Sequence, residues 1–112
     1  MRAYRDFLIP GNKDVSEEFM REKQIEQKLV AAVRSAGGLA LKFLSPGFDG
    51  VPDRLVLLPE SKIAFIELKA PGKTMRPLQA RRKRQLEKLG LKVYTMDSTE
   101  QIGGILGEIQ SS

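Results

Sequence analysis

The 112-residue chain contains no cysteine and no histidine. Without cysteine, the chain cannot form disulfide bonds or thiolate metal sites. Without histidine, zinc sites and histidine-based acid–base chemistry are excluded, so any bound metal must take oxygen ligands. These two absences narrow the catalytic options sharply.

Long apolar stretches are also missing. No run approaches the ~20 apolar residues that a membrane-spanning helix needs, and residues 1–10 lack the apolar segment of a signal peptide. We therefore expect a soluble intracellular, cytoplasmic protein with no membrane partner. The length fits a single domain, which we place at residues 14–112, preceded by a partner-contacting arm at residues 1–13.

The charge is unbalanced toward basic residues. Nineteen lysines and arginines against fourteen aspartates and glutamates give a net charge of +5, which favours an acidic partner, most simply nucleic acid. From Lys69 to Lys92 there are nine bases and a single acid, Glu87. The alternative is a solvated helix face, but consecutive bases repel one another without an anionic partner. The predicted contacts to the DNA backbone are Lys42, Lys73, Arg76, Arg81, Arg82, Lys83 and Arg84.

The periodicity predicts helices and strands in the order α-β-β-β-α-β-α, a mixed sheet flanked by helices. Helices are expected from Asp14 or Ser16 to Ala36 and from Pro77 to Leu89, the second with Leu78, Leu86 and Leu89 turned inward. A short C-terminal helix should place Ile102, Ile105, Leu106 and Ile109 on one side. Strands are expected at 39–43, 54–58, 62–69 and 91–96.

Two carboxylates share the buried stripe of the first helix. Glu22 and Glu26 have the helical spacing of Ile25, Leu29 and Val33. A carboxylate turned toward a core needs a cation or a metal. Either Glu26 is functional, binding a metal through water or completing a second metal site, or it reaches past the edge to solvent.

Asp53 precedes the second strand, and Glu67 and Lys69 share one face of the third because strand side chains alternate. The two carboxylates, with a backbone carbonyl near Leu68, provide a minimal Mg²⁺ or Mn²⁺ site. Lys69 would orient or help to deprotonate the nucleophile, or stabilise charge on phosphate oxygens. The alternative is a surface salt bridge, Glu67 with Lys69 or Asp53 with Arg54, which contributes little.

Five segments together resemble the VRR-NUC domain, the virus-type replication–repair branch of the PD-(D/E)XK nucleases. They are residues 37–42, 45–47, 50–54, 67–72 and 77–79, and the combination is far more specific than any one of them. The resemblance covers about residues 20–97. It implies an α/β restriction-endonuclease-like core with a short C-terminal helix.

The resemblance also implies roles for individual residues. Asp53 and Glu67 are similar to the metal ligands, Lys69 to the catalytic lysine and Gln79 to the glutamine that supports the site. Glu26 is similar to the glutamate of the first helix, with Glu22 as the competing candidate.

The implied activity is metal-dependent hydrolysis of DNA. Stand-alone members of this size are similar to phage and prophage enzymes that form homodimers resembling Holliday-junction resolvases. We therefore expect a structure-selective endonuclease for branched DNA, such as four-way junctions or flaps, that needs Mg²⁺ or Mn²⁺ and no small-molecule cofactor. The alternatives are a non-catalytic basic DNA-binding module, or a nuclease of another specificity. The N-terminal arm and the C-terminal helix are the expected dimer surfaces.

Overall fold

The computed structural model describes residues 13–112, with side chains from Ser16 onward, so the predicted N-terminal arm lies outside the described residues apart from Lys13. The described chain has the predicted order of elements. They are α2 (Lys13–Ser35), β1 (Leu39–Lys42), β2 (Arg54–Leu58), β3 (Lys62–Leu68), α3 (Pro77–Lys88), β4 (Val93–Met96), the 3₁₀ turn η2 (Thr99–Gln101) and α4 (Ile102–Gln110).

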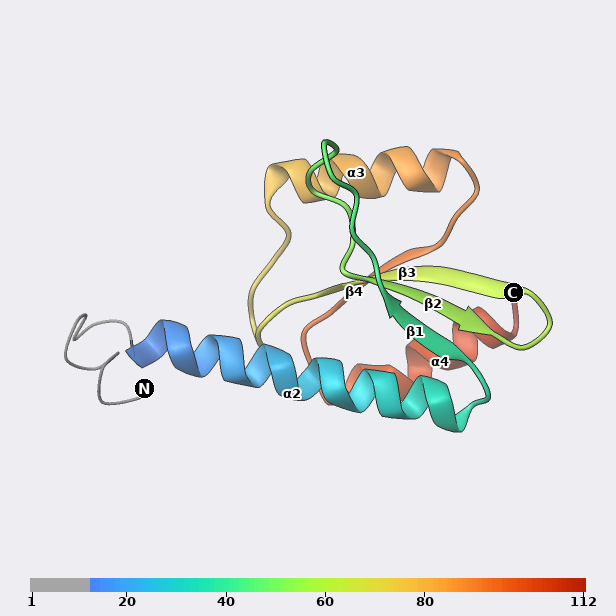
Figure 1. Ribbon diagram of the computed structural model, residues 1–112, viewed down its shortest axis with the longest axis horizontal. Coiled ribbons are helices and arrows are strands. Elements are labelled where there is room, and N and C mark those ends of the chain that lie inside the picture. Colours follow the sequence, from blue (N-terminus) through green and yellow to red (C-terminus); the bar gives the residue numbers. More distant parts are fainter. Residues whose placement is uncertain (1–12) are drawn as a thin grey trace.

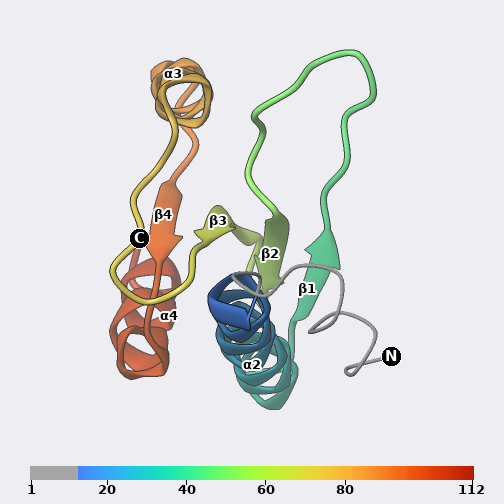
Figure 2. The ribbon, with the colours of Figure 1, turned by 90° about the vertical axis from the view of Figure 1, so that its left-hand side faces the viewer.

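The four strands form one mixed sheet in the order β1-β2-β3-β4. The β1–β2 and β2–β3 pairs are antiparallel and the β3–β4 pair is parallel. Helices α2 and α4 lie on one face, and α3 lies on the other side (Figures 1 and 2). The α/β fold with a mixed sheet flanked by helices, predicted from the sequence, is confirmed.

The core lies between the sheet and helices α2 and α4. Ile25, Leu29 and Val33 of α2 are buried at the predicted four-residue spacing, and α4 contributes Ile102, Leu106 and Ile109. We call this side of the sheet the α2/α4 face. Its strand residues include Val56, Leu58, Ala64, Ile66, Leu68 and Met96.

Helix α2 ends where the two glycines predict. Gly37 adopts a φ of 86°, which glycine reaches without a Cβ penalty. The Gly38 N–H donates to the Val33 carbonyl at 2.9 Å, and this bond satisfies a carbonyl left free by the helix end. The turn sends the chain directly into β1 at the edge of the sheet.

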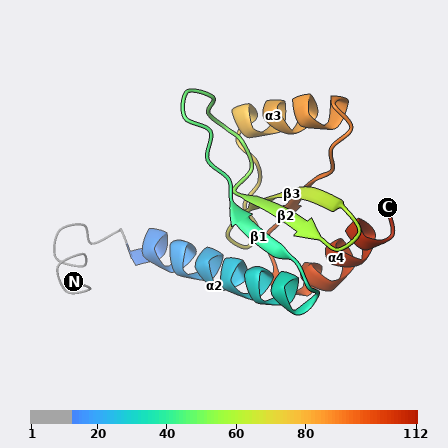
Figure 3. The same ribbon diagram turned by 45° about the vertical axis from the view of Figure 1, so that its right-hand side comes forward.

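The packing predicted for α3 is wrong. Leu78 and Leu89 are 40% and 77% exposed, and the buried residue of this helix is the polar Gln79. Leu86, the third leucine expected inside, is half-buried, and the helix axis stands off from the sheet (Figure 3). Gln79 therefore marks the side of α3 that meets the sheet.

The long loop between β1 and β2 rises toward α3 and is fastened to it (Figure 3). The Arg82 Nε–H donates to the Asp49 carbonyl at 2.7 Å, and the Arg82 guanidinium lies 3.7 Å from the centroid of the Phe48 ring. A Cβ on Gly50, whose φ is 88°, would come within 2.8 Å of Leu78. The loop leading into Asp53 is thus held against the basic helix.

None of the helices among residues 13–112 is both long enough and apolar enough to cross a bilayer.

Candidate active site

Asp53 sits at the point where the β1–β2 loop enters β2. Its Oδ2 accepts a hydrogen bond of 2.8 Å from the Leu68 N–H at the end of β3, and Oδ1 accepts none from the described residues. Because β2 and β3 are antiparallel neighbours with Arg54 opposite Ile66, the start of β2 and the end of β3 lie side by side at one end of the sheet. The bond to the backbone fixes where the carboxylate lies.

Glu67 is almost completely buried, with 2% of its surface exposed. Its Oε2 accepts a 2.7 Å hydrogen bond from Gln79 Nε2 and lies 3.5 Å from Lys69 Nζ. Its Oε1 is buried and has no hydrogen-bond partner among the described residues. Such an oxygen is costly to leave unpaired, and the burial rules out the surface salt bridge that the sequence left open.

Gln79 connects the catalytic candidates. Its side-chain oxygen accepts from Lys69 Nζ at 2.7 Å and from the Arg76 N–H at 2.9 Å, while its amide donates to Glu67. The proline at the start of α3 and these bonds anchor the first turn of the helix. The structure therefore brings Glu67, Lys69 and Gln79 together in one hydrogen-bonded cluster.

Burial and mutual repulsion shift the pKa values of the carboxylates. Burial, followed by the charge of Asp53, raises the pKa of Glu67 to about 7. Burial also raises the pKa of Asp53, against the hydrogen bond from Leu68 and the charge of Lys69. A pair of buried carboxylates that resist ionisation together is stabilised by a cation between them.

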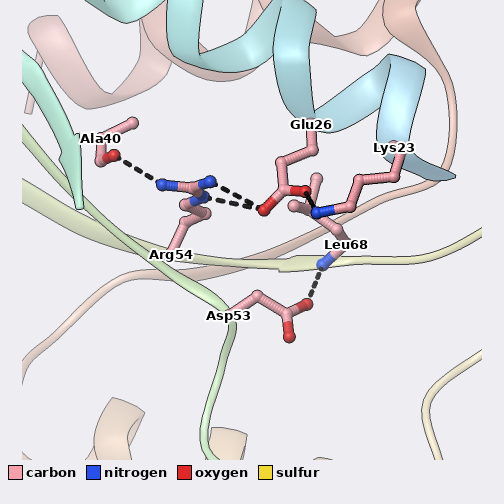
Figure 4. Close-up of polar contacts among 6 residues, drawn as sticks. All are labelled: Lys23, Glu26, Ala40, Asp53, Arg54 and Leu68. Carbon is pink, nitrogen blue, oxygen red and sulfur yellow. Dashed lines mark hydrogen bonds and ion pairs between the residues drawn. The ribbon is translucent and has the colours of Figure 1, made fainter. Parts of the chain in front are cut away.

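The hydrogen-bond partners of Glu26 differ from the partner of Asp53. Its Oε2 accepts from Arg54 Nη2 at 2.8 Å and Nε at 3.1 Å, and its Oε1 accepts from Lys23 Nζ at 3.1 Å (Figure 4). Burial works to raise the pKa of Glu26, but these hydrogen bonds outweigh it and hold the pKa below its usual value. Both oxygens of Glu26 are thus already neutralised by protein cations.

The ion pair of Glu26 follows from strand alternation. Arg54 lies on the α2/α4 face with Val56, whereas Asp53 precedes it and belongs to the opposite face. Arg54 also donates to the Ala40 carbonyl at 2.9 Å, which holds it under α2. This pair could not be predicted from the sequence, because its members are 28 residues apart.

Glu22 is a second helix carboxylate whose charge is coupled to the other candidates, as the charge of Glu26 is to Asp53. Burial raises the pKa of Glu22 first, followed by the charge of Asp53. Glu22 also contributes to the raised pKa of Glu67. Glu22, Glu26 and Asp53 line the same hollow at the end of the sheet, and Glu22 lies one turn of helix before Glu26.

The donor set fits a hard divalent cation. Among the described residues, no group of three or more acidic side chains is close enough to hold a metal. Two carboxylates with one oxygen each uncommitted do remain, at Asp53 and Glu67. Mg²⁺ commonly takes one or two protein carboxylates and fills its other positions with water and phosphate. Leu68 contacts the site through its N–H, and its carbonyl stays a predicted ligand.

The predicted DNA-contacting bases do not form one free surface. Arg82 is held by Phe48 and Asp49, and Lys83 Nζ donates to Glu87 and, at 3.1 Å, to the Val93 carbonyl. Lys73 pairs with Glu18 at 2.9 Å. The remaining four make no ion pair with any described residue and stay exposed or half-buried, at Lys42, Arg76, Arg81 and Arg84.

The chain is similar to two known proteins. No family model matches the chain. It is 52% identical over 81 residues to a protein named "Putative nuclease p44" from Acyrthosiphon pisum secondary endosymbiont phage 1, covering 72% of this chain and 87% of that protein. It also resembles a solved structure titled "VRR_NUC domain", with a TM-score of 0.73 and 28% identity over 78% of this chain and 95% of that one.

Proposed function

Because this chain belongs to the VRR-NUC family, we propose that it is a nuclease that hydrolyses DNA phosphodiester bonds with Mg²⁺ or Mn²⁺ held by Asp53 and Glu67. The observation that carries the proposal is the buried, unpartnered Oε1 of Glu67 at an edge shared with Asp53. A fold without a ligand there gains nothing from such an oxygen.

A divalent cation at this site would lower the pKa of a bound water and polarise the scissile phosphate. The residues of the chain position that chemistry. The Leu68 N–H keeps Asp53 in place, and Gln79 fixes the orientation of Glu67. Hydrogen-bonded partners of this kind commonly affect metal affinity or activity by about 10–100-fold.

Lys69 is the proposed catalytic lysine. Its ammonium lies between Glu67 Oε2 and Gln79 Oε1, so its position is fixed before substrate arrives. An ammonium held there stabilises negative charge that develops on phosphate oxygens. It also orients the attacking water by donating a hydrogen bond.

Glu22 is the helix carboxylate that we assign to the site in place of Glu26. The two Glu26 oxygens are engaged by Arg54 and Lys23, and Glu26 acts as the clamp that fixes α2 to β2. Glu22 and Glu26 both line the hollow that contains Asp53, so the assignment rests on the ion pairs of Glu26 and on the pKa of Glu22, which burial and then the charge of Asp53 raise. A water held between these two carboxylates would be well placed to lose a proton.

The proposed substrate is branched DNA, such as a flap or a four-way junction. The bases that make no ion pair, Lys42 and Arg76, flank the carboxylates, while Arg81 and Arg84 extend along α3. They provide phosphate contacts without an element suited to reading base edges. Selectivity for the shape of the DNA rather than its sequence follows.

We also propose a homodimer, which would place two sites on opposing strands. Helix α4 is not a suitable interface because its apolar side is buried in the core of the same chain. On the sheet face opposite α2 and α4, three aliphatic side chains are more than 40% exposed: Leu39, Leu41 and Ile63. Leu41→Glu should therefore convert a dimer to a monomer in sedimentation experiments, whereas Leu89→Glu on α3 should not.

The function is tested by cleavage of labelled linear duplex, single strand, flap and four-way junction, each with Mg²⁺, Mn²⁺ and EDTA. Wild type should cut branched DNA only with metal, and Lys69→Ala should abolish cutting. Lys88→Ala is the matched control, because Lys88 is an exposed lysine of α3 that makes no ion pair with the described residues. Binding without cutting under every metal would leave a non-catalytic DNA-binding module instead.

A further inference from the structure

Two hollows open beside the N-terminal half of α2, and Phe19 and Glu22 line both of them. The first, of about 170 Å³, contains Asp53 and Lys42. The second, of about 380 Å³, contains Lys69 and other basic side chains of the loop before α3. Phe19 therefore borders both the hollow that contains Asp53 and the hollow that contains Lys69.

Phe19 does not contribute to the core. It is 58% exposed, whereas Ile25, Leu29 and Val33 further along α2 are buried. Leu44, from the loop after β1, lines the first hollow as well and is 76% exposed. These two large apolar side chains come from different elements and flank a hollow whose other lining is mostly polar or charged.

Acidic side chains line both hollows, with Glu22, Glu26 and Asp53 in the first and Glu18 and Glu22 in the second, and each hollow also has one cation available to a phosphate. Lys42 lines the first hollow and Arg76 the second, and neither makes an ion pair with a described residue. A strand whose successive phosphates approached these two cations would cross Phe19 between them. The aromatic ring would then meet a base rather than a phosphate.

We propose that Phe19 stacks on an unpaired base next to the cleaved phosphodiester, with Leu44 against the sugar and base from the other side. The inference rests on the proposed nuclease function and specifies its substrate. Stacking on aromatic side chains tolerates any base sequence. Within an intact duplex both faces of a base are already covered by its neighbours, so a base must be unpaired, as at a flap or junction, to stack on Phe19.

The test is equilibrium binding with Mn²⁺ to two DNAs, measured by fluorescence anisotropy: a duplex with a short unpaired flap, and the continuous duplex. Lys69→Ala serves as the background so that the DNA stays intact. Phe19→Ala should weaken flap binding roughly 10-fold or more, as expected for the loss of one stacked base, and should change duplex binding by less than 2-fold. Phe19→Trp should retain flap binding.

Met20→Ala provides the matched control, because Met20 is 60% exposed on the same helix and lines neither hollow. A 2-aminopurine in the flap supplies a second readout, since stacking on the ring should quench its fluorescence in the Phe19 protein and not in Phe19→Ala. Equal affinities for Phe19→Ala and Met20→Ala would overturn the proposal. So would an equal loss of binding to flap and duplex.

Failure of this inference differs from failure of the proposed function. If Phe19→Ala does not change flap binding but Lys69→Ala still abolishes cleavage, the protein is a nuclease and Phe19 does not stack on a base. If the wild-type protein cuts none of the DNAs, the proposed nuclease function is wrong. The flap-specific quenching then still reports whether Phe19 stacks on a base.

Discussion

The two faces of the sheet differ in what they bury: apolar side chains alone fill the core under α2 and α4, whereas the other face buries a polar cluster beside Phe65 and Val93. The α2/α4 face is closed by apolar side chains, and Leu29, Ile66 and Met96 are fully buried there. On the other face, the buried groups near α3 include Glu67 and Gln79, joined to each other and to Lys69. One face provides most of the stability of the fold, and the other carries charges whose burial opposes that stability.

The same contrast appears within α2. Its C-terminal half supplies the core residues Ile25, Leu29 and Val33, while its N-terminal half leaves Phe19 and Met20 exposed beside the site. Glu26 directly follows Ile25 and is neutralised by Arg54. A single helix thus serves the core at one end and the site at the other. This division predicts which substitutions separate folding from activity.

The largest effect is expected from Asp53→Asn. Removal of a carboxylate proposed to bind the metal should forfeit several kcal/mol of transition-state stabilisation, so cleavage should fall on the order of 10³-fold. The melting temperature should stay within a few degrees of wild type, because the pKa of Asp53 is raised in the fold and the neutral amide removes that burden. Single-turnover cleavage and calorimetry measure the two effects. Full activity in Asp53→Asn would remove the proposed site.

Leu29→Ala should give the reverse pattern. Leu29 is fully buried, and truncation of such a leucine destabilises a protein by about 2–5 kcal/mol. Denaturant unfolding should show that loss, while the cleavage rate at low temperature, where the protein remains folded, should change less than threefold. A large loss of activity in the folded variant would show that the two faces are not independent.

Gln79→Met tests how the polar cluster is positioned. The change keeps the length of the side chain but removes its bonds to Glu67, Lys69 and the Arg76 N–H. Cleavage should fall about 10–100-fold, with a higher Mn²⁺ concentration needed for half-maximal rate. Gln85→Met, on the exposed side of the same helix, is the control. Equal rates for the two variants would limit Gln79 to capping α3.

Glu22→Gln and Glu26→Gln distinguish the two helix carboxylates. Glu22→Gln should lower cleavage about 10-fold or more with little change in stability, because burial and then the charge of Asp53 raise the pKa of Glu22 in the fold. Glu26→Gln should instead lower the free energy of unfolding by about 1–3 kcal/mol, since the half-buried Arg54 loses its charged partner. If cleavage depends on Glu26 and not on Glu22, the assignment is reversed.

The smallest effect is a pH dependence of stability in EDTA. The pKa of Glu67 is raised to about 7 in the folded chain, above its usual value near 4.5. Between these values the folded protein binds more protons than the unfolded chain, so stability falls as pH rises from about 5 to 8. The melting temperature should therefore fall over that range, and Glu67→Gln should flatten the slope. A flat wild-type profile would contradict the pKa shift.

The sequence predicts most of this fold because its signals are local. Strand alternation placed Ala64, Ile66 and Leu68 on one face and Glu67 on the other, and Gly37 marked the end of α2. Helix spacing shows which residues share a side of α3, but it cannot show whether anything covers that side. For that reason Leu78 and Leu89 were wrongly expected to be inside.

The sequence does not distinguish Glu22 from Glu26, for a related reason. Both fall on one helical stripe, and the difference depends on Arg54, which is distant in sequence and placed on the α2/α4 face by strand alternation. The contact between Arg82 and Phe48 could not be predicted either, because Arg82 belongs to a run of basic residues that suggested DNA contact alone.

Joint binding of a divalent cation by Asp53 and Glu67 is the proposal on which the assigned function depends. Its most direct test is isothermal titration calorimetry with Mn²⁺ on wild type, Asp53→Asn, Glu67→Gln and Glu26→Gln at one pH near neutrality. We expect binding in wild type and in Glu26→Gln, and a loss of at least 10-fold in affinity in the other two. Undiminished Mn²⁺ binding in Asp53→Asn and Glu67→Gln would show that these two carboxylates do not hold the cation.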